Sequence, residues 1–286
     1  MTERLTTGYG LIEAPLWVPE RGLLFSDVVF GGVFALDRDG DVSTVFEHRR
    51  GIGGMVLHTD GGVLVSGRNI SYKPFEGGST RTLLDRDEDS GLVGFNDITT
   101  DRAGRVYAGG LGSSPVFEDG RPPTAGDLWL IDLDGAGRVV ASDVLLSNGL
   151  GVSPDGATLY HSDSLRNAVM RYDVADDGSL GPKMEFAATD IGAPDGLAVS
   201  EDGGVWVALA GGGCVGRFDP DGSLRETIEI SEPMCTSVCF GGDDLRDLYV
   251  VSGSDGAAGD RAGSAYRIRT DVAGLPVPPA RVALPS

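Results

Sequence analysis

The chain has few of the residues that mark several common classes of protein. Its 286 residues include three cysteines and three histidines, and 23 lysines and arginines stand against 43 aspartates and glutamates, a formal net charge of −20. A surface this acidic repels polyanions, so we expect neither nucleic acid nor an anionic membrane as a partner. An odd number of scattered cysteines (Cys214, Cys235 and Cys239) does not suit a disulfide framework and predicts reduced thiols.

Long apolar runs and helical periodicity are also missing. The first residues, MTERLTTGYG, contain no apolar segment of a signal peptide, and no later run is long enough to cross a bilayer. We therefore expect a cytoplasmic protein. No window shows a sustained apolar stripe at i, i+3 and i+4, so the pattern does not predict helices. Nothing in the sequence indicates the oligomeric state.

The chain instead has many short apolar runs separated by turn residues. It contains 45 glycines and 15 prolines, scattered rather than in tracts, which is typical of a turn-rich all-β protein. The stretch LLSNGLGVSPDGATLYHSDS (145–164) shows the unit clearly, because Ser153-Pro154-Asp155-Gly156 forms a hairpin turn signal between two strand-like runs. Asn148 stands at the start of the first run, where the hairpin itself needs no asparagine.

The same unit recurs six times. The leading positions of the six copies are Glu13, Gly54, Asn96, Asn148, Asp195 and Thr236. A period of roughly 40 to 50 residues with four short strands is typical of propeller blades. We therefore predict an all-β fold, a six-bladed β-propeller, as a single domain over residues 1–286.

Two irregular segments interrupt this repeat. The loop 111–126, rich in Gly, Pro and Ser, is either a surface excursion or a lid over one face, since long loops in compact domains are often functional. The Pro-rich end, 276–286, is expected to close the ring by pairing with the first blade.

Four of the leading positions carry oxygen donors. In a propeller the innermost strands line a central channel, so Glu13, Asn96, Asn148 and Asp195 are expected to converge near one mouth of it. Two carboxylates and two amides suit a hard cation. The absence of His and Cys argues against a dedicated zinc cage and favours Ca²⁺, with Mg²⁺ or Mn²⁺ as alternatives. Taken singly, each residue also suits a turn or a cap.

The ordered motifs resemble those of the senescence-marker-protein/gluconolactonase/regucalcin family. The resemblance covers nearly the whole chain and is carried by five segments: EAPLW (13–17), FND (95–97), SNGL with SPDG (147–156), PDGLA (194–198) and TSVCFGG (236–242). It implies a six-bladed propeller with one divalent metal in the channel, Ca²⁺ first and Mg²⁺, Mn²⁺ or Zn²⁺ as alternatives. By match, Glu13, Asn148 and Asp195 would be the metal ligands. Asn96 would contact the substrate or a water held by the metal, and Asp195 would also be the general base.

The resemblance therefore implies a metal-dependent lactonase or related ester hydrolase acting on a small molecule. Family members that act on sugar-acid lactones usually carry an arginine two residues before this asparagine, where the present chain has Gly94. We expect Gly94 to bind nothing and to open space, which argues against a simple sugar-acid lactone as substrate. The alternatives are a phosphotriesterase-like hydrolase on the same propeller and a non-catalytic propeller that binds calcium or a partner.

Overall fold

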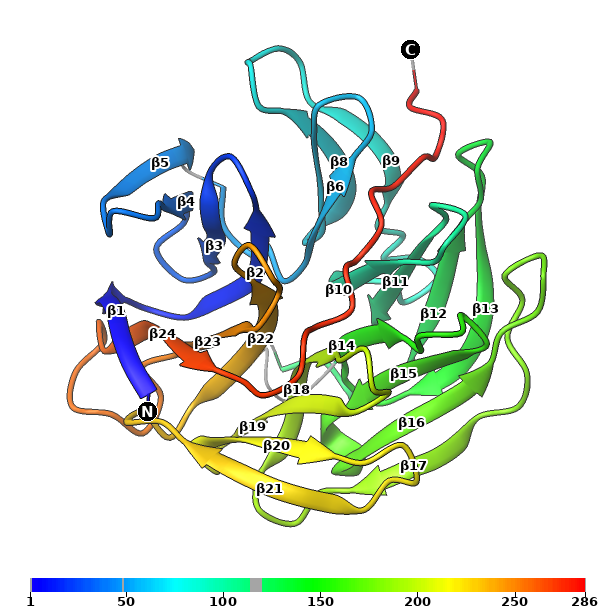
Figure 1. Cartoon of the computed structure of the whole chain (residues 1–286). Helices are drawn as coiled ribbons and strands as arrows, with labels where there is room; N and C mark the ends of the chain where they lie inside the picture. The colour runs from blue at the N-terminus through cyan, green and yellow to red at the C-terminus, as the bar shows by residue number, and fades with distance from the viewer. Residues whose placement is uncertain (1, 48, 114–119, 286) are drawn as a thin grey trace.

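The repeated units of the sequence fold as six antiparallel sheets of four strands, arranged around one axis (Figure 1). The computed structural model describes residues 2–47, 49–113 and 120–285. Over these residues the chain is nearly all-β, with one short 3₁₀ turn, η2 (Ser164–Arg166). The prediction of a six-bladed propeller is confirmed.

Each blade begins at the axis and runs outward. The first three blades contain the strands β2 (Ile12–Val18), β3 (Gly22–Asp27), β4 (Val33–Leu36) and β5 (Val42–Phe46); β6 (Met55–His58), β7 (Gly62–Val65), β8 (Asn69–Pro74) and β9 (Arg81–Asp85); and β10 (Gly94–Thr100), β11 (Val106–Leu111), β12 (Gly126–Ile131) and β13 (Gly137–Val144). The next two contain β14 (Ser147–Val152), β15 (Thr158–Asp163), β16 (Ala168–Asp173) and β17 (Met184–Ala188); and β18 (Ala193–Val199), β19 (Val205–Ala210), β20 (Cys214–Phe218) and β21 (Leu224–Glu229). The sixth blade contains β22 (Cys235–Gly241), β23 (Asp247–Ser252), β24 (Gly263–Arg269) and β1 (Thr2–Tyr9).

Local turn chemistry explains the hairpins. In the 153–156 turn the Gly156 amide donates to the Ser153 carbonyl oxygen at 2.9 Å, and Gly156 has φ 81°, a conformation that glycine adopts without strain. The Asp155 carboxylate accepts the Ala157 amide at 3.0 Å and so fixes the exit of the turn. The core then forms where neighbouring blades meet. Trp206 of the fifth blade, for example, packs in one buried cluster with Leu248 and Tyr266 of the sixth.

The ring is closed by the start of the chain. Strand β1 pairs antiparallel with β24, with Thr2 opposite Ile268 and Tyr9 opposite Gly263. The expectation that 276–286 closes the ring by pairing with the first blade was therefore wrong. Pro276, Pro278 and Pro279 lack the N–H groups that an outer strand would need to donate.

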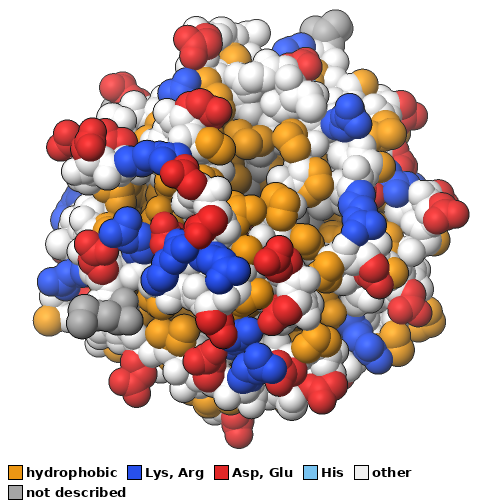
Figure 2. Space-filling model, in the orientation of Figure 1, with side chains coloured by type: hydrophobic (Ala, Val, Ile, Leu, Met, Phe, Trp, Pro, Cys, Tyr) orange, Lys and Arg blue, Asp and Glu red, His pale blue; other side chains and the backbone are white. Residues whose placement is uncertain are grey.

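The C-terminal residues instead cross the axis. We call residues 271–280 the strap; it is the red segment that passes over the middle of the molecule in Figure 1. The Leu275 amide donates to the Val199 carbonyl oxygen at 2.8 Å, and the Ala280 amide donates to that of Leu57 at 2.7 Å. Since Val199 ends β18 and Leu57 lies near the end of β6, the strap covers the end of the channel opposite the leading positions. Figure 2 shows hydrophobic side chains gathered in the middle of this face.

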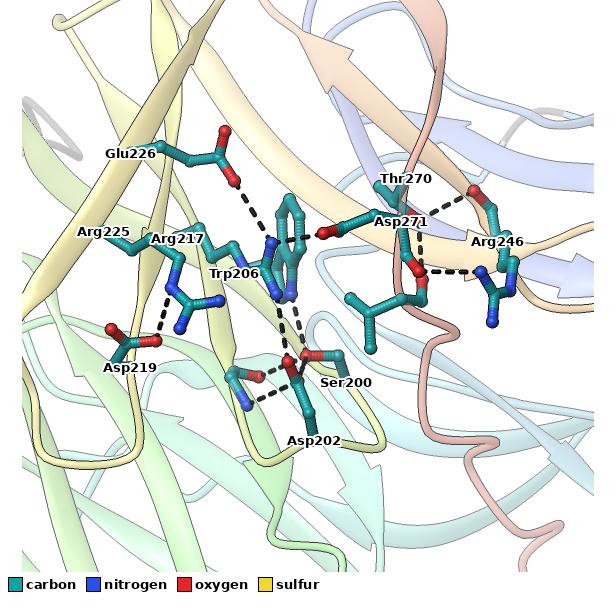
Figure 3. A network of polar contacts seen from close by, with 12 residues as sticks. Ser200, Asp202, Trp206, Arg217, Asp219, Arg225, Glu226, Arg246, Thr270 and Asp271 are labelled. Carbon is teal, nitrogen blue, oxygen red and sulfur yellow. Dashed lines mark hydrogen bonds and ion pairs between the residues drawn. The ribbon is translucent and has the colours of Figure 1, made fainter.

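A buried arginine anchors the beginning of the strap (Figure 3). Arg217 on β20 is 3% exposed and its guanidinium lies 4.7 Å from the centre of the Trp206 ring. It donates hydrogen bonds to Asp202 at 3.0 Å, to Glu226 at 3.2 Å and to Asp271, the first residue of the strap, at 3.1 Å. Arg217 therefore joins the fifth blade to the strap.

Other predictions about the chain's organisation remain open. The loop 111–126 leaves β11 beside Gly94, at the end of the channel that holds the leading positions, and the Ser113 amide donates to Thr124 Oγ1 at 2.8 Å. Residues 114–119 lie outside the described residues, so the lid stays a prediction, as does the single domain over 1–286. Within the described parts of the chain, no helix is long and apolar enough to cross a membrane.

Candidate active site

A β-bulge sits at the start of five of the six innermost strands. The register between strand one and strand two of each blade slips between Glu13 and Leu16, Phe95 and Ile98, Ser147 and Leu150, Pro194 and Leu197, and Cys235 and Ser237. A bulge interrupts the alternation of side chains and turns residues that would face the sheet toward another direction. The bulges contain or border Glu13, Asn96, Asn148 and Asp195, so the four predicted site residues share one structural position.

Hydrogen bonds between blades hold these bulges together. Thr236 Oγ1 donates to the Ile12 carbonyl oxygen at 2.6 Å, next to Glu13. Ser164 Oγ donates to the Pro194 carbonyl oxygen at 2.6 Å, next to Asp195. Each bond fixes the backbone immediately before a carboxylate, and each crosses from one blade to its neighbour. The site is thus built from the interfaces between blades rather than from any one of them.

The two asparagines are directly linked. Asn96 Nδ2 donates to the Asn148 side-chain oxygen and, at 2.9 Å, to the Ser147 carbonyl oxygen. Asn148 Nδ2 in turn donates to Ser164 Oγ at 2.7 Å. A continuous chain of hydrogen bonds therefore runs from Asn96 through Asn148 and Ser164 to the backbone before Asp195, and it fixes the orientation of the Asn148 amide.

Glycines allow the innermost strands to approach each other closely at this level. A Cβ on Gly149 would lie 2.4 Å from the Leu197 nitrogen, and one on Gly54 would lie 2.6 Å from the Ile98 nitrogen. Any larger residue would have to push the neighbouring backbone away. This explains why the repeat places Gly beside its polar leading residues.

Three buried carboxyl groups face each other across the blades. Glu13 is 8% exposed, Asp195 is 5% exposed and Asp97, which follows Asn96, is 9% exposed. Burial raises the pKa of Glu13 well above its usual range, and the nearby Asp195 and Asp97 raise it further. Burial, then Asp97, likewise raises the pKa of Asp195, and burial raises the pKa of Asp97 to about 7. The site therefore disfavours three negative charges in the absence of a cation.

In the described parts of the chain, these carboxyls have no positively charged partner. Among the residues that the structure describes, none of the three forms an ion pair, and Asp195 Oδ1 and Asp97 Oδ2 have no hydrogen-bond partner. No group of three His, Cys, Asp or Glu side chains in the described residues is arranged to hold a single ion. A metal bound by Glu13 and Asp195 would therefore need the Asn148 amide oxygen as well. Such an all-oxygen set, with an unpaired carboxylate oxygen, fits Ca²⁺.

The sequence interpretation singled out Asn96 and missed its neighbour Asp97. The signal was present as an Asn-Asp pair at the leading position of the third blade. It assigned no role in the site to His161, which is fully buried on β15 with its Nε2 2.9 Å from Ser147 Oγ. Burial lowers the pKa of His161 to about 3, so this ring is neutral and supports the strand that carries Asn148.

Sequence comparison adds the family. Residues 11–254 match the SMP-30/Gluconolactonase/LRE-like region. The chain belongs to this family. The resemblance carried by the five sequence segments is confirmed.

Members of the SMP-30/gluconolactonase family include curated relatives of nearly the same length. A 6-deoxy-6-sulfogluconolactonase of Pseudomonas putida is 34% identical over 278 residues and covers 93% of each chain. A regucalcin of Xenopus laevis is 33% identical and covers 91% of each chain. A pentonolactonase of Haloferax volcanii is 29% identical and covers 96% of each. Two of these relatives are lactonases, so a lactone-hydrolysing propeller fits the family position of this chain.

Solved structures in the family share the fold. A luciferin-regenerating enzyme superimposes with a TM-score of 0.87 at 23% identity and covers 99% of both chains. A calcium-binding regucalcin of Agrobacterium tumefaciens superimposes with a TM-score of 0.86 at 22% identity and covers 99% of this chain and 98% of its own. At this level of identity the likeness concerns the fold.

The structure corrects one expectation about the family's arginine position. A Cβ on Gly94 would lie 2.9 Å from the Gly67 carbonyl oxygen, which accepts the Phe95 amide at 2.7 Å. The space beside Gly94 is therefore already filled by the second blade, and the expectation that Gly94 opens space was wrong. The position still carries no guanidinium. Arg68 follows Gly67, and its Cα would lie 3.8 Å from that Cβ.

Proposed function

We propose that this chain is a divalent-metal-dependent hydrolase that opens a lactone or a related ester. The observation that carries the proposal is the set of buried carboxyls at the bulges, which lack counter-ions in the described structure and lie beside the Asn148 amide. The proposed ligands are Glu13, Asn148 and Asp195, and Ca²⁺ is the first choice of metal. The lactonase names of the relatives support the reaction, and the regucalcin names support calcium.

A divalent cation held there would act as a Lewis acid on the lactone carbonyl. The protein's own contribution begins with Asp195, whose Oδ1 is unpartnered among the described residues and is therefore free to accept the proton of an attacking water. Asn96 is half-buried beside Asn148, and we propose that it contacts the substrate while its Nδ2 keeps the Asn148 amide in place. Glu13, in the first blade, supplies a second carboxylate from the side of the axis opposite Asn148 in the fourth blade.

The proposed substrate class follows from the absence of an arginine at position 94. Without a guanidinium at this position, the carboxylate and hydroxyl oxygens of a simple sugar-acid lactone lose a binding partner. We propose that such lactones are poor substrates, and that a lactone or ester without this requirement is preferred. Cytoplasmic location and the absence of nucleic-acid and membrane partners remain predictions from the sequence.

A hydrolysis screen tests this function. Purified protein stripped of metal is assayed on sugar lactones, aliphatic lactones, aryl esters and phosphotriesters, with Ca²⁺, Mg²⁺, Mn²⁺ and Zn²⁺ in turn. We expect metal-dependent opening of lactones, and a fall in kcat/KM of about 10²–10⁴-fold in Asp195→Asn. Asp39→Asn, an exposed carboxyl on a distant turn, serves as the matched control.

Three outcomes would redirect the proposal. Lactone hydrolysis that survives both Asp195→Asn and chelation would contradict the assignment of Asp195 as the base and the requirement for a metal. Turnover confined to phosphotriesters would favour the phosphotriesterase-like alternative. Metal binding by the intact protein without turnover of any of these substrates would favour a non-catalytic calcium-binding propeller.

A further inference from the structure

A cavity of about 340 Å³ lies in the channel on the strap side of the proposed active site. It begins at residues within the bulges or at their ends, such as Ala14, Asp97 and Leu197, and it ends against strap residues 275–279. We call it the strap chamber. Its volume is within the range of small-molecule sites in proteins, roughly 300 to 1,000 Å³.

The strap chamber is a separate compartment from the active site. Glu13, Asn148 and Asp195 are not among its lining residues. The glycine contacts described above draw the innermost strands together at the level of the bulges. Gly149 against the Leu197 nitrogen is one such contact, and it lies between the Asn148 layer and the chamber.

The chamber is mostly apolar, with the hydroxyl groups of Thr99, Thr100 and Ser237 and one carboxyl group in its lining. Its wall contains Trp17, Leu57, Ile98, Val152 and Phe240, and the strap adds Leu275 and Val277. Among its described lining residues, Asp97 is the only one with a charged side chain. Asp97 is 9% exposed, and its Oδ2 finds no hydrogen-bond partner in the described part of the chain. A buried carboxyl of this kind costs free energy unless a partner pairs with it.

The charges around Asp97 determine which kind of ligand can pair with its carboxyl group. Asp97 shares the region with Glu13 and Asp195, and the chain as a whole carries a net charge of −20, so an anionic ligand is repelled. A Ca²⁺ ion prefers several carboxylate ligands among its six to eight oxygens, and the described lining supplies one carboxylate. A monovalent organic cation needs one carboxylate for its ammonium group and an apolar wall for its body, and the chamber offers both.

We propose that the strap chamber binds a small primary alkyl- or arylalkyl-ammonium ion, whose N–H groups donate to Asp97 and whose apolar body packs between the innermost strands and the strap. The volume accommodates roughly ten non-hydrogen atoms, at about 30 Å³ each. The lining residues are not the proposed metal ligands or base, although Asp97 belongs to the same carboxyl cluster as Glu13 and Asp195.

The strap has the features of a removable cover. Between the anchored amides of Leu275 and Ala280, three of the four residues are prolines without an N–H group. The only described side-chain hydrogen bond to this middle part is from Thr100 Oγ1 to the Pro278 carbonyl oxygen. Pro276 and Val277 are exposed. A ligand can therefore reach the chamber through a shift of four residues without breaking a strand.

Isothermal titration calorimetry of the full chain with benzylammonium chloride tests the proposal. Excess Ca²⁺ is kept in the buffer so that the ammonium ion does not occupy the proposed metal site. Benzyl alcohol, of the same shape and without charge, is the comparison ligand. We expect benzylammonium to bind at least tenfold more tightly than benzyl alcohol, and Asp97→Asn to weaken benzylammonium at least tenfold while Asp39→Asn changes it less than twofold.

A second variant tests the location without changing the charge. Val152→Phe places a larger side chain in the chamber wall and leaves Asp97 intact, so binding of benzylammonium is expected to be lost. Equal affinity for the alcohol and the ammonium ion, unchanged binding in Asp97→Asn, or unchanged binding in Val152→Phe would each overturn the proposal. Metal-dependent lactone hydrolysis would be unaffected by such a failure, which separates the two proposals.

Discussion

Replacing Asp97 by asparagine should stabilise the metal-free protein, and more so at high pH. The folded-state pKa of Asp97 is about 7, against 3.8 for the ordinary carboxyl, because burial disfavours the charge. The folded protein therefore binds this proton more tightly than the unfolded chain does. The contribution of Asp97 to stability is fully present below pH 3.8 and is lost as the pH rises to about 7.

The size of the effect follows from the same shift. Each pKa unit corresponds to about 1.4 kcal/mol, so raising the pH from 5 to 8 costs the native protein on the order of 3 kcal/mol through this group. Asp97→Asn removes the loss, since the amide of the same shape does not ionise. The free-energy advantage of the variant over the native chain should therefore be on the order of 3 kcal/mol larger at pH 8 than at pH 5.

Urea denaturation followed by tryptophan fluorescence measures this difference. The native chain, Asp97→Asn and the exposed control Asp39→Asn are compared at pH 5 and pH 8 in the presence of a chelator. The control should show no pH-dependent advantage beyond about 0.5 kcal/mol. An Asp97→Asn advantage of equal size at both pH values would refute the assignment of Asp97 as a buried carboxyl without a counter-ion.

Three further perturbations have expected outcomes. Ser164→Ala removes the hydroxyl between Asn148 and the Pro194 carbonyl, and it should weaken Ca²⁺ binding about 10- to 100-fold by calorimetry. Ser162→Ala, whose hydroxyl has no described partner, is the control, and equal affinities of the two variants would contradict the role of Ser164. Arg217→Met keeps the apolar stem over Trp206 and loses the link to Asp271, so the free energy of unfolding should fall by about 1–3 kcal/mol in urea titrations. An unchanged free energy would mean that the ion pairs of Arg217 with Asp202, Glu226 and Asp271 contribute nothing to stability. Arg68→Ala should change kcat/KM on neutral lactones less than twofold, and a selective loss above tenfold on anionic lactones would show that Arg68 provides the guanidinium that position 94 lacks.

The sequence was sufficient to predict the blades because each one is encoded locally. Turn residues such as Ser153-Pro154-Asp155-Gly156 specify hairpins, and the spacing of the hairpins specifies the repeat. Ring closure is different in kind, since β1 pairs with β24 across more than 250 residues. The sequence TERLTTGY (2–9) contains no local pattern that identifies β24 as its partner strand. The prolines of the strap lack N–H donors and were a local signal against an outer strand, which the expectation for 276–286 did not take into account.

The site shows a similar division. The residue types at Glu13, Asn148 and Asp195 are visible in the repeat, and the structure places all three at the starts of innermost strands. Asp97 was missed because strict alternation in a strand puts the neighbour of Asn96 on the opposite face. The bulge between Phe95 and Ile98 breaks that alternation. A bulge is a feature of pairing between two strands, so one strand's sequence does not reveal it.

The charge at the axis ties the two proposed sites together. Glu13, Asp195 and an ionised Asp97 carry three negative charges, and one divalent cation would leave one of them uncompensated. The remaining charge is then met in one of two ways: Asp97 keeps a proton, or a monovalent cation pairs with it from the strap chamber. The chamber supplies no lysine or arginine for this role among its described lining residues. A cation bound in the chamber and a metal bound by Glu13, Asn148 and Asp195 would repel each other directly. Both would also reduce the repulsion among the three carboxylates. Measuring benzylammonium affinity with and without Ca²⁺ therefore reports which of these two opposing effects is the larger.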